Sequence, residues 1–118
     1  MGAEDVLLQA ERLAGIFRKS PEFSAYVSAK SAVLSDPGLA RRLAEYKNAI
    51  FDYKTRAVSG AAAAPDFDEE RVLSVAYSDL LMNERAREFL EREEAVFGLV
   101  NGVSEILGEV WGELELEL

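Results

Sequence analysis

Four carboxylates near the C-terminal end are the most obvious groups in this chain that could do chemistry. Glu88, Glu91, Glu93 and Glu94 fall within a short stretch of the sequence. Paired carboxylates can act as general acids and bases, and clusters of them bind metal ions. Metal sites in helical bundles, however, take carboxylates from several facing helices and generally add His, which this chain lacks. We therefore expect no metal site and interpret the cluster, with the exception of Glu93, as a solvated helix face.

The residue types that are missing exclude much of catalysis. With no Cys among 118 residues, the chain has no thiol nucleophile, disulfide or thiolate metal site. With no His, it lacks the usual general base at neutral pH. It also has no Gly-rich phosphate loop and no serine on a nucleophile elbow. We expect no catalytic residue, no cofactor and no enzymatic activity, although Asp, Glu, Tyr and Lys can still do acid–base work.

Length and charge narrow the class of protein further. The length and the 49% hydrophobic content are those of one globular domain over residues 1–118. No run of apolar residues is long enough to cross a membrane, and the start lacks a secretory signal, so we expect a cytoplasmic protein. The net charge of −9 is concentrated after Asn83, where ten Glu face three Arg. Such a surface repels phosphate backbones, and we expect no direct binding to nucleic acid.

One long helix over about 82–114 must organise the fold. Its apolar residues follow each other in steps of three and four, with Glu93 as the one interruption. Further apolar residues flank this seam on both sides, so the stripe is wider than a two-stranded coiled coil needs. A helix of this length would measure roughly 45 to 50 Å, longer than a compact subunit of this size. We expect a second copy of the chain to cover it.

The predicted interface between copies is therefore the seam of this helix, and we expect a homodimer or a homotetramer. Glu93 is the polar residue of the seam, and we take it to fix the register between helices. Trp111, near the end of the stripe, is a candidate interface anchor. The predicted interface residues are Phe89, Glu93, Val96, Phe97, Val100, Val103, Leu107, Val110 and Trp111.

Four further helices are predicted before the long one, which makes the fold class all-α, packed as an oligomeric bundle. Asp5, Ser20, Asp36, Asp66 and Asn83 are the predicted N-caps. Pro follows Ser20 and Asp36 directly, as is typical of a first helical position. The helix that starts after Ser20 is expected to bury Phe23, Tyr26, Val27 and Leu34. A connector or hinge is predicted near 59–66, where glycine and proline flank four alanines.

The third predicted helix has a basic character, from Arg41, Arg42, Lys47, Lys54 and Arg56. These residues form either an ordinary exposed face or a docking strip for the acidic helix of a partner or a second subunit. The four tyrosines, one or two in each of the second, third and fourth predicted helices, are expected to pack in the core with their hydroxyls at the rim.

Two segments of the chain resemble the YlbF/YmcA family of small all-helical bacterial regulatory proteins. The first runs from Phe23 through Tyr26, Lys30, Leu34 and Asp36-Pro37 to Leu43 and Tyr46. The second comprises Leu81-Met82-Asn83, Phe89-Leu90, Glu93-Glu94, Phe97, Leu99-Val100, Val103 and Ile106-Leu107.

The resemblance implies an all-α, self-associating protein with a long C-terminal helix and no enzymatic activity. It links the protein to competence, sporulation and biofilm control, and to a complex that assists messenger RNA processing. That complex is associated with iron–sulfur clusters held by cysteines, which this chain does not have, so we expect no cofactor.

The sequence thus favours a regulatory adaptor that acts through self-association and through a protein partner in a regulatory complex. One alternative is a carrier of small apolar ligands, in which the wide apolar stripe of the long helix lines a pocket. Another is a helical bundle of unrelated function.

Overall fold

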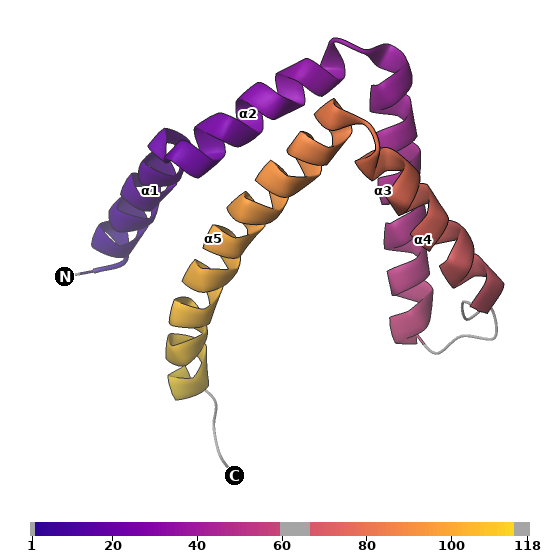
Figure 1. The fold of residues 1–118 in the computed structure, drawn as a ribbon. Coiled ribbons are helices and arrows are strands. Elements are labelled where there is room, and N and C mark those ends of the chain that lie inside the picture. Colours follow the sequence, from indigo (N-terminus) through magenta and orange to yellow (C-terminus); the bar gives the residue numbers. More distant parts are fainter. Residues whose placement is uncertain (1, 60–66, 115–118) are drawn as a thin grey trace. The chain divides into compact units, whose positions relative to one another are not determined.

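The computed structural model describes residues 2–59 and 67–114, and its regular elements there are five α-helices (Figure 1). They are α1 (Ala3–Lys19), α2 (Pro21–Leu34), α3 (Pro37–Ser59), α4 (Phe67–Leu81) and α5 (Glu84–Leu114). The predicted all-α class and the long C-terminal helix are confirmed, since α5 runs for 31 residues. No helix within the described ranges is both long and apolar enough to cross a membrane.

The described backbone divides into two units. One consists of Ala29–Phe89, and the other of the described parts of Met1–Ser28 and Leu90–Leu118. The boundary falls within α2 and within α5, not in the connector between α3 and α4. The predicted connector near 59–66 falls almost entirely outside the described residues, and that 1–118 is one domain stays a prediction.

Side-chain caps define the starts of three helices at the residues predicted from sequence. The backbone N–H of Phe23 donates to Ser20 Oγ at 3.2 Å, and that of Leu39 donates to Asp36 Oδ1 at 3.2 Å. At the start of α5, the N–H of Ala86 donates to Asn83 Oδ1 at 3.1 Å. These bonds satisfy donors that have no partner within the helix. The predicted cap Asp66 lies outside the described residues.

The cap of α1 differs from the prediction. The helix begins at Ala3, and its N-cap is Gly2. Asp5 lies three residues further on, where its Oδ2 accepts a bond from the Gly2 N–H at 3.1 Å. Asp5 is therefore the acidic partner that reaches back to the cap, because the helix extends three residues further than the apolar pattern showed.

The core of the 29–89 unit is small and comes from all four helices present in it. Its buried apolar residues are Ala29, Val33, Leu39, Leu43, Leu80, Ala86 and Phe89. Helices α3 and α4 pack most closely of the described pairs. The predicted buried face of α2 is wrong in part, since Val27 and Leu34 are exposed and Ala29 and Val33 are buried instead. Apolar residues lie around much of this helix, so spacing alone does not select a face.

We predict that Asn83→Ala destabilises the protein by about 1 kcal/mol, because the Ala86 N–H loses its acceptor at the start of α5. Asn83→Asp keeps an acceptor and adds a negative charge at the helix N-terminus, so it should preserve stability. Urea denaturation followed by circular dichroism measures both variants. Equal stability of Asn83→Ala and the wild type would contradict the role of this cap.

Candidate functional site

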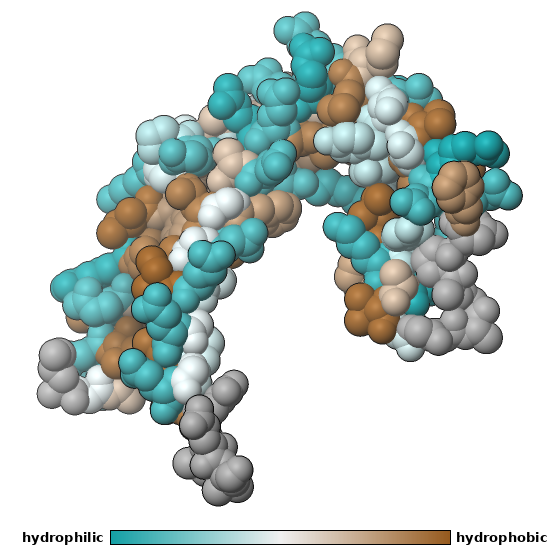
Figure 2. Space-filling view, turned by 60° about the horizontal axis from the view of Figure 1, so that its bottom comes forward, coloured by the Kyte–Doolittle hydropathy of each residue, from teal (hydrophilic) through white to brown (hydrophobic). Residues whose placement is uncertain are grey.

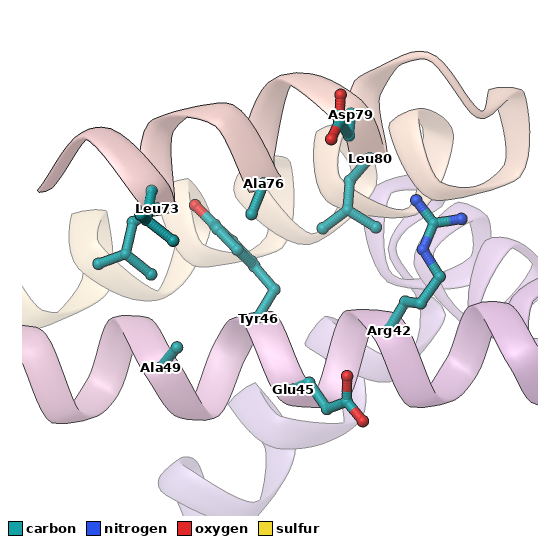
Figure 3. Close-up of a pocket in the computed structure, with 9 residues that line it drawn as sticks. Arg42, Glu45, Tyr46, Ala49, Leu73, Ala76, Asp79 and Leu80 are labelled. Carbon is teal, nitrogen blue, oxygen red and sulfur yellow. The ribbon is translucent and has the colours of Figure 1, made fainter. Parts of the chain in front are cut away.

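A groove runs along one side of the contact between α3 and α4 (Figure 3). Its volume is about 320 Å³. Helix α3 contributes Arg42, Glu45, Tyr46 and Ala49, and α4 contributes Val72, Leu73, Ala76, Asp79 and Leu80. The floor is apolar, while both signs of charge are present among the lining residues. Within the described ranges no group of Asp or Glu side chains could hold a metal ion.

An ion pair joins the C-terminal part of α3 to the first turn of α4. The guanidinium of Arg56 donates to both carboxylate oxygens of Glu69, with Nη1 to Oε2 at 3.0 Å. Its Nε also donates to Asp52 one turn earlier at 3.0 Å. The hydrogen bond to Glu69 is the main cause that raises the pKa of Arg56. Arg56, predicted as part of an exposed or docking strip, instead forms an ion pair between these two helices.

Tyrosines pack across the same helix pair. The ring centroids of Tyr46 and Tyr77 are 5.8 Å apart, and their planes are tilted by 32°. Burial, and to a smaller extent the neighbouring Tyr77, raises the pKa of Tyr46 above its usual value of 10.0. The raised pKa means that the folded environment favours the neutral, protonated form of Tyr46.

The predicted interface residues of α5 fall into three groups by exposure. Phe89 is buried at 7% exposure, with Lys47 Nζ over its ring at 5.4 Å from the centroid. Glu93, Val96 and Val103 are half-buried. The exposed ones are Phe97, Val100, Leu107, Val110 and Trp111, which range from 43% at Val100 to 61% at Trp111.

A second set of apolar side chains is exposed on α1, which belongs to the same unit as the second half of α5. These are Val6, Leu7, Leu8, Leu13 and Ile16. Figure 2 shows hydrophobic side chains reaching the surface in both units. Exposed apolar surface of this kind, when contiguous, marks sites of protein–protein contact.

Comparison with known proteins identifies the family to which this chain belongs. A family model described as control of competence regulator ComK, YlbF/YmcA, matches residues 6–110. The chain belongs to the YlbF/YmcA family. The resemblance noted in the sequence is thereby confirmed.

The chain is also similar to two individual proteins. A UPF0342 protein of Desulfitobacterium hafniense (strain Y51) is 27% identical over 100 residues, which cover 85% of this chain and 79% of that protein. A chain of the crystal structure of Bacillus subtilis RicA in complex with RicF superposes with a TM-score of 0.61 at 17% identity. The match covers 95% of this chain and 97% of that chain, and shows a shared fold.

Sequence reasoning missed the groove and the ion pair of this YlbF/YmcA-family protein. Both depend on which face of α3 meets α4, and two amphipathic helices of one sequence do not reveal their relative rotation. One signal was present: Arg56 lies close to the end of α3, and the acidic triplet Asp68, Glu69 and Glu70 opens α4. Two antiparallel helices joined by a short connector bring such termini together.

We predict that the wild-type protein loses stability above about pH 10, and that Tyr46→Phe loses less. The folded state holds the Tyr46 proton more tightly than the unfolded chain, because its pKa is raised. That contribution is complete below the unfolded pKa and disappears as the pH rises through the folded pKa. Urea denaturation of both proteins at pH 7 and pH 11 tests this. A stability difference between them that is the same at both pH values would contradict it.

Proposed function

We propose that this YlbF/YmcA-family protein is a regulatory adaptor that acts through self-association and through contact with a protein partner, without enzymatic activity. The observation that carries the proposal is the apolar face of α5 between residues 96 and 111. Its side chains from Phe97 to Trp111 are largely exposed in the single chain. Removing such a face from water is favourable by about 25 cal/mol for each Å² buried, which provides a driving force for association.

The proposed interface comprises Glu93, Val96, Phe97, Val100, Val103, Leu107, Val110 and Trp111, and joins copies of the chain into a dimer or tetramer. Phe89 lies at the edge of this proposed interface, because its ring is already buried beneath Lys47 within the single chain. The opposite side of the helix carries Glu94, Glu105 and Glu109. A helix with one apolar and one acidic side associates through the first and keeps the second in water.

The family supports a regulatory role. Its description names the control of a competence regulator, and the structurally similar chain comes from a crystal structure of RicA in complex with RicF. By the same resemblance, the processes it serves are competence, sporulation, biofilm formation and messenger RNA processing. A protein that presents an exposed helix face and belongs to such a family is suited to bring other proteins together.

The alternative, a carrier of small apolar ligands, has less support. The groove between α3 and α4 is at the lower end of the volume typical of ligand sites. Arg42, Glu45 and Asp79 also line it, and charged side chains are poor neighbours for an apolar ligand. Binding of an apolar dye by the intact native oligomer would favour the carrier over the adaptor.

We predict that the wild-type protein is a dimer or tetramer at micromolar concentration, as measured by size-exclusion chromatography with light scattering. Val100→Asp or Leu107→Asp should weaken association by at least about a hundredfold, because each places an unpaired charge in an apolar interface.

The matched control is Gly98→Asp, which adds the same charge on the opposite side of α5, where an added side chain meets no other atoms, and should leave the oligomer intact. Circular dichroism shows whether each variant is folded. A wild-type monomer, or a folded Val100→Asp oligomer of unchanged mass and stability, would defeat the proposed interface.

A further inference from the structure

A hollow on the α3–α4 pair is lined by three of the four tyrosines of the chain. Tyr46 and Tyr53 come from α3, and Tyr77 comes from α4. The volume of the hollow is about 230 Å³. Its remaining lining residues are Ile50, Glu70, Leu73 and Ser74. We call this set the tyrosine hollow; it shares only Tyr46 and Leu73 with the groove of Figure 3.

The tyrosine hollow is both aromatic and open to solvent. Tyr46 and Tyr77 are in ring contact, and Tyr77 is 40% exposed. Neutral phenol rings have electron-rich faces, which attract cations that lie over them. A hollow of this size holds the end of a side chain, and is smaller than typical sites for drug-sized ligands.

The charge of the tyrosine hollow also favours a cation. Glu70 is the charged residue among those that line it. Its two acidic neighbours in the sequence are each paired, Asp68 with Arg71 and Glu69 with Arg56. Glu70 forms no ion pair with any basic side chain of the described residues. The hollow therefore presents one uncompensated carboxylate next to three aromatic rings.

We infer that the tyrosine hollow binds the guanidinium group of an arginine presented by a protein partner. Guanidinium is planar and weakly hydrated, stacks on aromatic faces, and pairs with a carboxylate through two hydrogen bonds. The compact, strongly hydrated ammonium of lysine is less suited to a shallow aromatic surface. The inference rests on the proposed function, because the partner that supplies the arginine is a protein.

Titration of the full-length protein with a matched pair of probes tests the inference. The probe is Nα-acetyl-arginine N-methylamide, and the control is the citrulline counterpart, which is nearly the same shape but neutral. The tyrosine ring signals are followed by NMR with isotope-labelled tyrosine. The arginine probe should shift the signals of Tyr46, Tyr53 and Tyr77 in a saturable way and leave Tyr26 unchanged. The citrulline probe should bind at least about fivefold more weakly.

Variants locate the site. Tyr77→Leu should weaken binding of the arginine probe by about two- to fivefold, whereas Tyr77→Phe keeps the ring and should bind normally. Glu70→Gln should also weaken binding. Asp79→Asn is its matched control, since it removes an exposed carboxylate from the same helix but lines the other groove. Circular dichroism confirms that each variant is folded.

Equal binding of the two probes, or equal effects of Glu70→Gln and Asp79→Asn, would overturn the inference. The failure of the proposed function is a separate result. If the arginine probe does not bind while Val100→Asp dissociates the oligomer, the tyrosine hollow has no such role and the α5 interface stands. If the arginine probe binds as expected and the wild type is a monomer, the proposed α5 interface is wrong and the proposed role of the tyrosine hollow is supported.

Discussion

The central constraint on this structure is that α5 has a long apolar face, and the single chain buries only the first part of it. The first turns of α5 are packed, as buried Ala86 and Phe89 show. Beyond residue 96 most apolar side chains remain exposed, and they continue to Trp111 with helical spacing. Water is a poor solvent for such a face, so association is the natural way to remove it. Acidic residues lie on the other side of the helix, where contact with water is favourable, so the proposed association uses the apolar side.

The two ends of α5 therefore differ in how much of their apolar surface is buried. Its start belongs to the 29–89 unit, where Asn83 caps it and the Phe89 ring lies beneath Lys47. In that unit, the pair of α3 and α4 is held by the ion pair of Arg56 with Glu69 and by packed tyrosines. The second half of α5 has no comparable set of buried apolar residues among those described. One continuous helix thus connects a packed region to a face that is available for binding.

The sequence predicted those features that depend on local chemistry. Ser20, Asp36 and Asn83 cap helices as expected, because a side-chain acceptor before an amphipathic stretch acts on its own first turn. Features that depend on how helices rotate against each other were missed. Arg56 was assigned to an exposed or docking strip, yet it pairs with Glu69 across 13 residues of sequence. The tyrosine hollow likewise needs two helices in register, which composition does not specify.

The central claim is that another copy of the chain covers the far half of α5, and Trp111 reports on this directly. It is the single tryptophan, and it is 61% exposed in the isolated chain. We expect its fluorescence to shift to shorter wavelength, and its quenching by acrylamide to fall, as concentration rises through the transition from monomer to oligomer in light scattering. A tryptophan that remains equally accessible across that transition, or that is already shielded in a dilute monomer, would contradict the claim.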